Sequence, residues 1–426
     1  MANAKLFTTV LAVPTFFFVI SPYLNFDTAS AVLFLAFLIF LIIKHRKKLD
    51  FQSMLKIGKI PIVYAVLWRT KFGISFMESF ASKRKELVKL FGYCSIGLGF
   101  FGMIFISLQI AYLLFRLFIS PKEASQGVSL VLPLTHIPGL GYLSFWHFLI
   151  ALFITILVHE FAHGIVAKAH NIHIKSSGLG VFSPILPILP LAFVEPDEKQ
   201  LQKSPDIVQY SIYAAGPIVN VILSILVMLV MVWAITPVEN AITHPIGFSF
   251  TGVMKDFPAD EAGLLPGTVI KKANGIEILD YGSFSKEVGV LKPGDIVTLE
   301  AEDSKVYMLT AKESVENPGT GYIGITGIQN ERRINDGFEL IDSPFFWLKG
   351  LLRWLLIINF AVGLINLLPM IITDGGRMLK VALEKLIGKG RKADSAWAFV
   401  GLVFLFTIIL ALAMNYGFKI LSVIGN

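Results

Sequence analysis

The chain has 426 residues, of which 55% are hydrophobic and 16% are charged, and its mean hydropathy is +0.70. Soluble domains are far more polar, so this composition excludes an ordinary soluble protein and predicts one that sits in the lipid bilayer. The net charge of +7 would suggest a nucleic-acid partner in a soluble protein. Here the Lys and Arg residues gather in loops beside apolar stretches, so we expect no nucleic-acid partner.

Apolar stretches long enough to span a bilayer recur along the chain, and about seven spans are expected. They run at about residues 7 to 22, 30 to 43, 94 to 118, 143 to 168, 208 to 235, 345 to 368 and 396 to 415. The first is expected to stay as an anchor, because it lacks the clean cleavage site of a signal peptide. The predicted fold class is therefore a mostly α polytopic membrane protein.

These stretches divide the chain into four regions. Residues 1–93 are predicted to form a two-helix membrane anchor and a basic cytoplasmic loop, which has many Lys and Arg and few acids. Residues 94–236 and 341–426 are predicted to form the two parts of a membrane core, with a small extramembrane domain at residues 245–330. Threading the spans outward from the basic loop puts this domain on the extracytoplasmic side, and we expect the membrane to be the cell membrane.

The fourth apolar stretch contains the pattern His-Glu-x-x-His at His159, Glu160 and His163. On a helix the two His residues share one face, so both imidazoles can bind a single zinc ion while Glu160 reaches its water. Alternatively, the imidazoles hydrogen-bond to neighbouring helices or hold a structural ion. Three ionisable groups inside a spanning segment are costly unless they bind metal, pair or face water, which favours the metal site. With Cys94 as the single cysteine, zinc must use nitrogen and oxygen ligands.

Residues 176–194 are apolar but are broken by Pro184, Pro187 and Pro190. Such a segment cannot be a spanning helix, so it is predicted to be a re-entrant or interfacial loop. An extended edge there could pair with a substrate unwound into a strand. A simple lipid-facing connector is the alternative.

The composition becomes polar and glycine-rich over residues 245–330, where short β-like runs alternate with turns. The stretch from Pro258 to Gly275 resembles a PDZ domain, which implies a small α+β fold. PDZ domains bind extended peptide tails by strand addition, so a peptide tail is a candidate partner. We rank a second role, a size filter that excludes bulky substrates, slightly ahead of tail capture.

The sixth apolar stretch ends in a segment that includes Pro369 and Asp374-Gly375-Gly376. Proline and glycine interrupt the helix there, so Asp374 is presented by irregular backbone near the inner membrane surface. We predict Asp374 as the third zinc ligand, which leaves a fourth position open for water, as a catalytic zinc requires. Without the histidine motif, Asp374 would read as an ordinary helix cap.

Asn359 and Asn366 lie seven residues apart on one helix face. Their amides could hydrogen-bond a substrate backbone or an oxyanion. Hydrogen bonds that hold helices together are an equally good interpretation.

Together these motifs resemble the site-2 proteases, which are intramembrane zinc metalloproteases. The resemblance covers most of residues 140–390, and it implies that His159, His163 and Asp374 bind one Zn²⁺ and that Glu160 is the general base. The segment Ala215-Gly216-Pro217 with Asn220 also matches a family helix, and Asn220 is a candidate for substrate positioning. Residues 176–194 look like the membrane-dipping β-loop of the family, and PDZ domains like the one suggested here interrupt many of its members. The family often has a proline-rich stretch where this chain has Met370-Ile371-Ile372-Thr373.

The resemblance implies an endopeptidase that cleaves transmembrane segments of other membrane proteins in regulated intramembrane proteolysis. Its active site is expected nearer the cytoplasmic face. Two alternatives are a catalytically silent membrane scaffold with a PDZ-like domain and a divalent-metal transporter. Glu160 argues against transport, which needs ligands but no base, and the complete set of ligands and base argues against a silent scaffold.

Overall fold

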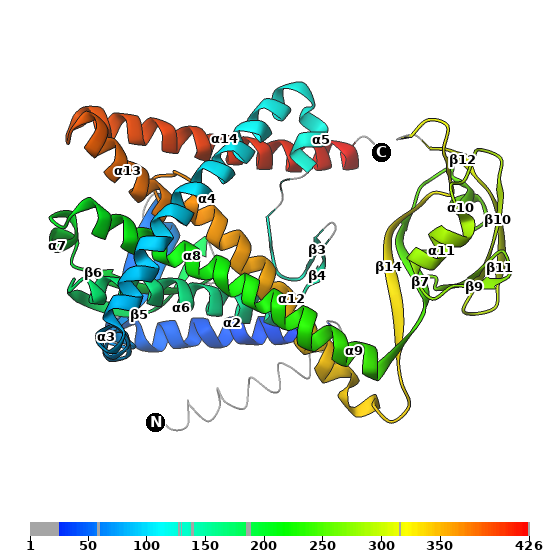
Figure 1. Ribbon diagram of the computed structural model, residues 1–426, viewed down its shortest axis with the longest axis horizontal. Coiled ribbons are helices and arrows are strands. Elements are labelled where there is room, and N and C mark those ends of the chain that lie inside the picture. Colours follow the sequence, from blue (N-terminus) through cyan, green and yellow to red (C-terminus); the bar gives the residue numbers. More distant parts are fainter. Residues whose placement is uncertain are drawn as a thin grey trace. The chain divides into compact units, whose positions relative to one another are not determined.

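The computed structural model describes residues 25–57, 60–126, 128, 130–137, 140–184, 189–314 and 317–424 (Figure 1). The predicted first span, at about residues 7 to 22, lies outside these residues. Within them, six helices are long and apolar enough to cross a membrane: Phe26–Lys48, Lys85–Ile119, Phe145–Ala169, Asp206–Ile242, Glu339–Leu367 and Arg391–Phe418. They coincide with the other predicted spans, and the prediction of an integral membrane protein is confirmed.

The chain divides into two compact units, Met1–Leu229 with Gly350–Asn426 and Val230–Lys349. The first unit holds the long helices and a small sheet. Its helices are α2 (Phe26–His45), α3 (Ile74–Lys83), α4 (Lys85–Ile119), α5 (Pro121–Gln126), α6 (Phe145–Ala169), α7 (Glu198–Gln202), α8 (Asp206–Val230), α13 (Asp374–Ile387) and α14 (Arg391–Ile424). The helix α12 (Glu339–Leu367) begins in the second unit and ends in the first.

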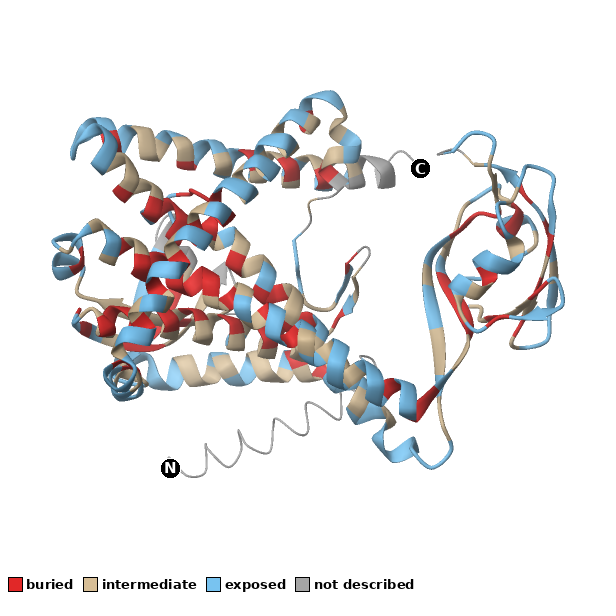
Figure 2. Cartoon of the chain, viewed as in Figure 1, coloured by how far each residue is buried: buried red, intermediate tan, exposed pale blue. Residues whose placement is uncertain are grey.

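The core of the first unit lies where α3, α4, α6, α8 and α13 pack together. Small side chains dominate the contact, including Ala162 and Ala167 of α6 and Ala214 and Ala215 of α8, all of which are buried. Small residues let helix backbones approach closely, which is how helices pack inside a bilayer. Within this core, buried positions are most frequent on α6 and α8 (Figure 2).

A four-stranded antiparallel sheet joins distant parts of the sequence in the first unit. Its strands are β1 (Asp50–Ile57), β2 (Ile60–Thr70), β5 (Ile174–Pro184) and β6 (Leu189–Pro196), in the order β1-β2-β5-β6. The region expected to be a basic loop therefore contains two strands and a helix as well. The proline-broken segment forms the β5–β6 hairpin, and β6 is the terminal strand. A short hairpin of β3 (Thr135–Ile137) and β4 (Gly141–Leu143) precedes α6.

The second unit is sheet-rich, as expected for a separate extramembrane domain. After η2 (Met231–Ile235) and α9 (Thr236–Ile242), its main sheet has the order β11-β10-β8-β7-β14, with β9 paired to β8. The remaining bounds are β7 (Thr243–Val253), α10 (Pro258–Glu261), β8 (Ile270–Ala273), β9 (Ile276–Glu277), α11 (Tyr281–Val288), β10 (Ile296–Ala301), β11 (Val306–Thr310), β12 (Lys312–Glu313), β13 (Gly321–Tyr322) and β14 (Ile325–Ile334). Phe248, Phe250 and Ile270 are fully buried in its own hydrophobic core. The PDZ assignment stays a prediction.

Candidate metal centre

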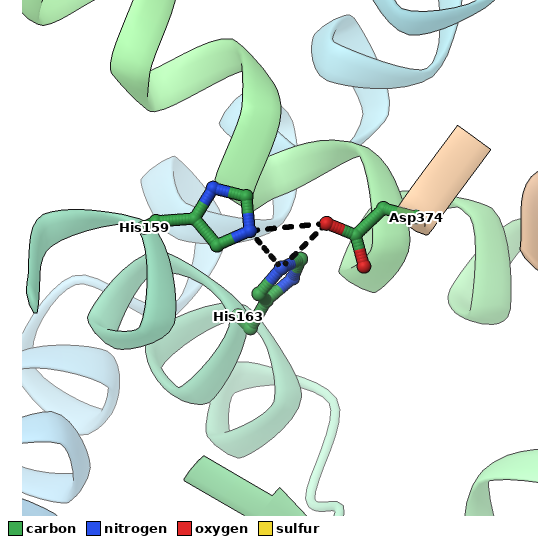
Figure 3. A group of neighbouring side chains, drawn as sticks. All are labelled: His159, His163 and Asp374. Atoms are coloured by element: carbon green, nitrogen blue, oxygen red, sulfur yellow. Dashed lines mark hydrogen bonds and ion pairs between the residues drawn. The ribbon is translucent and has the colours of Figure 1, made fainter. Parts of the chain in front are cut away.

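Three predicted ligands converge in the first unit (Figure 3). His159 Nε2 lies 3.0 Å from Asp374 Oδ2, His163 Nε2 lies 3.2 Å from the same oxygen, and the two nitrogens are 3.1 Å apart. The two His residues come from successive turns of α6, and Asp374 comes from the start of α13. Residues more than 200 positions apart in the sequence are thus brought to one point.

The donor set fits a zinc ion. Ligand atoms about 2.0 to 2.2 Å from a tetrahedral zinc lie roughly 3.3 to 3.6 Å from one another, and the measured separations are only slightly shorter. Two imidazoles and one carboxylate also leave a fourth position for water or substrate. A metal ion bound by these side chains would therefore form a catalytic site and not a structural one.

Hydrogen bonds behind the two imidazoles direct the Nε2 atoms toward the centre. His163 Nδ1 lies 2.6 Å from the Ile212 carbonyl oxygen, which can only accept, so Nδ1 carries the proton and Nε2 offers its lone pair. His159 Nδ1 lies 3.2 Å from the Asn220 amide nitrogen, while Asn220 Oδ1 is buried and has no partner among the described residues. Turning the Asn220 amide over would pair this oxygen with His159 Nδ1–H. Both imidazoles would then be oriented by an outer partner, which is the usual arrangement for zinc-binding His.

Replacing Asn220 by Ala should weaken zinc binding by about 10- to 100-fold, because His159 loses the group that fixes its tautomer and ring orientation. Competition with a zinc chelator, followed by metal analysis of the purified protein, measures the change. Ser224→Ala is the matched control, since Ser224 is buried on the same helix and donates to the Val221 carbonyl instead. Equal zinc affinity in Asn220→Ala and wild type would show that Asn220 does not support His159.

Glu160 is held beside the metal ligands by the sheet. Its Oε2 accepts a hydrogen bond of 3.0 Å from the backbone N–H of Val194 in β6. Glu160 follows His159 directly in α6, so the helix fixes its Cα and the strand fixes its carboxylate. The remaining carboxylate oxygen is available for a water molecule in the cavity that Glu160 lines.

The local sequence around Asp374 explains how this residue is presented. Thr373 is the N-cap of α13, and its hydroxyl accepts from the Gly376 backbone N–H at 3.2 Å. A Cβ on Gly375 would lie 2.1 Å from the Leu367 carbonyl oxygen, and one on Gly376 would lie 1.6 Å from that of Met370. The two glycines therefore let the first turn of α13, which begins at Asp374, pack against the end of α12 and the turn that follows it. The cap of this helix is Thr373.

A cavity of about 270 Å³, here called the metal cavity, adjoins the three ligands. Asn366 lines it, and its amide makes no hydrogen bond within the described part of the chain. Asn359 does not line it; this side chain is fully buried and its amide donates to the Leu355 carbonyl at 2.9 Å. Asn220 is also absent from the lining and contacts His159. Of the three Asn residues predicted to position substrate, the structure thus brings only Asn366 to the metal cavity.

Two further polar side chains, Tyr213 and Arg377, line the metal cavity and were not predicted from the sequence. Tyr213 of α8 gives no pattern that marks it in advance. Arg377 follows Asp374 by three residues, so the one-turn spacing on a helix could have placed both on one face.

Residues 147–408 match the profile of peptidase family M50. An uncharacterized protein of Methanocaldococcus jannaschii is 29% identical over 83% of this chain and 85% of its own length. A protein of Arabidopsis thaliana named "probable membrane metalloprotease ARASP2, chloroplastic" is 28% identical over 56% of this chain and 70% of its own. The zinc metalloprotease RasP of Shouchella clausii is 23% identical over 49% of this chain and 59% of its own.

Proposed function

The chain belongs to peptidase family M50, and from this premise we propose that it is an intramembrane endopeptidase that cleaves transmembrane segments of other membrane proteins. As a zinc metalloprotease with several apolar helices, it is an integral membrane enzyme. The observation that carries the proposal is the meeting of His159, His163 and Asp374 beside Glu160 on one cavity. Family membership favours a protease over the scaffold and the transporter.

We assign His159, His163 and Asp374 as the zinc ligands. Zinc held there would polarise the scissile carbonyl and make a water molecule easier to deprotonate. Glu160 would take a proton from the water at its free carboxylate oxygen and later deliver it to the leaving amine. The N–H of Val194 keeps the other oxygen in place, so the base does not swing away between the two proton transfers. Asn366, whose amide has no hydrogen-bond partner among the described residues, would donate a hydrogen bond to a substrate carbonyl in the metal cavity.

The substrate would reach the site as an extended strand. A peptide bond inside a helix is hydrogen-bonded and surrounded by side chains, so the helix must unwind before Glu160 can act. The strand β6 is terminal in its sheet and contributes Phe193 and Val194 to the metal cavity. An unwound substrate could therefore lie along β6 as an added strand.

The sidedness of the enzyme is also part of the proposal. The basic residues between the first spans favour the cytoplasmic side for the loop that contains them. On this basis we place the active site nearer the cytoplasmic face of the membrane. The second unit would then lie on the extracytoplasmic side. There, as a PDZ-like domain, it would exclude substrates with large outer domains, or bind a peptide tail.

The change Glu160→Gln should lower cleavage by at least about 100-fold while leaving zinc bound, since the amide cannot accept the proton. The test is to co-express wild type or variant with candidate single-span membrane proteins and to detect the fragments by immunoblot. Glu287→Gln, which changes an exposed Glu in α11 of the second unit, is the matched control and should cleave like wild type. Equal amounts of product from wild type and Glu160→Gln would refute the mechanism.

A further inference from the structure

A second cavity, here called the side cavity, lies beside the metal cavity and measures about 240 Å³. The two cavities share the end of β6, at Phe193, Val194 and Pro196. From α13 they share one side chain, that of Arg377. The two cavities therefore adjoin at the end of β6 and at Arg377.

Several charged and amide side chains line the side cavity. Gln52 and Arg69 line it from β1 and β2, and Glu195 and Glu198 line it from the end of β6 and from α7. Hydrogen bonds from Ser176 and from Arg69 hold the pKa of Glu195 below its usual range. Glu195 therefore carries its charge at neutral pH, and the charged and amide side chains give the side cavity hydrogen-bond partners for the polar part of a chain that continues beyond an apolar segment.

The guanidinium of Arg377 has unpaired N–H donors where the two cavities adjoin, among the residues that the structure describes. Its guanidinium lies 4.0 Å from Asp374 Oδ1, too far for a hydrogen bond, and 5.7 Å from the centre of the Tyr213 ring. Within the part of the chain that the structure describes, the side-chain N–H groups of Arg377 make no hydrogen bond, and the side chain is 54% exposed. A guanidinium offers five donors in a planar fork, so this half-exposed side chain has donors for a ligand.

We propose that the substrate strand crosses from the metal cavity into the side cavity and that Arg377 positions it there by donating hydrogen bonds to its backbone carbonyl oxygens. This inference rests on the proposed function and adds a substrate-binding residue to the same site. The strand would lie between β6 on one side and the guanidinium on the other. A planar fork with two parallel donors suits this task better than the single point charge of a Lys.

The test measures substrate binding separately from catalysis. A fluorescently labelled peptide with one apolar span and polar flanks is titrated with the detergent-solubilised Glu160→Gln protein, in which cleavage is expected to be at least about 100-fold slower, and the anisotropy of the peptide gives Kd. Adding Arg377→Met should raise Kd by about 10- to 100-fold, the effect of losing one or more hydrogen bonds to a charged donor. Arg377→Lys should give an intermediate rise, because the charge remains without the fork.

The same substitution is then made in the active enzyme. Arg377→Met should raise KM by a similar factor and change kcat far less, because the contact is made before the reaction begins. Arg391→Met is the matched control for both measurements; Arg391 is exposed at the start of α14 and lines neither cavity. It should leave Kd and KM as in the parent protein.

Three results would overturn the inference: an unchanged Kd in Arg377→Met, a lower kcat with an unchanged KM, or loss of zinc from Arg377→Met. The second would make Arg377 a group that acts in the transition state, and the third would make it a support for Asp374. Failure of the proposed function gives a different result, in which the peptide binds in an Arg377-dependent way but wild type never cleaves it.

Discussion

Replacing Asp374 by Asn is expected to remove both zinc and peptidase activity while leaving the helices folded. The carboxylate oxygen Oδ2 lies 3.0 and 3.2 Å from the two imidazole nitrogens, and it brings a negative charge that Asn lacks. An amide oxygen is a much weaker ligand than a carboxylate for a divalent ion bound otherwise by neutral imidazoles. The loss of zinc affinity should exceed the roughly 10- to 100-fold that loss of an outer partner costs.

Metal analysis of the purified protein, together with the rate of peptide cleavage, checks this prediction. Asp394→Asn makes the same chemical change in α14, where Asp394 is exposed and pairs with Lys380 at 3.1 Å. This control should keep its zinc and its activity. An Asp374→Asn protein that binds one zinc per chain as tightly as wild type would exclude Asp374 from the ligand set.

The spanning helices could be predicted because each is a local feature of the sequence. Hydropathy over about 20 residues is enough to find α4 or α14, whatever the rest of the chain does. The strands β1 and β2 were not predicted, since they lie among many basic residues. The strand β2 is fixed by pairing with β5 more than 100 positions later, as in the pair Thr70 and Ser177, and β1 is fixed by pairing with β2. Such pairing leaves little trace in the local pattern.

The metal centre was predictable to the extent that helix spacing determines it. His159 and His163 must share a face of α6, and the irregular backbone before Asp374 marked it as a third ligand. The role of Asn220 was predicted differently, as a contact to substrate. Its contact with His159 Nδ1 depends on how α8 crosses α6, and sequence spacing within α8 carries no information on that crossing. The hydrogen bond between His163 Nδ1 and the Ile212 carbonyl oxygen also depends on this crossing.

Replacing Gly216 by Ala should also abolish cleavage, because this position leaves no room for a side chain. Gly216 lies on α8 against the metal centre, and a Cβ there would be 2.3 Å from His163 Nε2 and 2.8 Å from His159 Cε1. Real Cβ atoms essentially never approach so closely, so at least one imidazole must move away from the centre. Displacing a reacting group by about 1 Å can cost on the order of 100-fold in rate, and here the zinc ligands themselves are displaced.

Zinc content, chelator competition and cleavage rate of purified Gly216→Ala would each fall, whereas far-UV circular dichroism should match that of wild type. Gly97→Ala is the control, since Gly97 lies in α4 and a Cβ there meets nothing within 4 Å. Ala is also the better helix former, so this control should fold at least as well as wild type. Normal zinc affinity in Gly216→Ala would mean that the imidazoles can bind the ion from positions further from α8. In that case the close approach of α8 to the two histidines would not be needed to form the site.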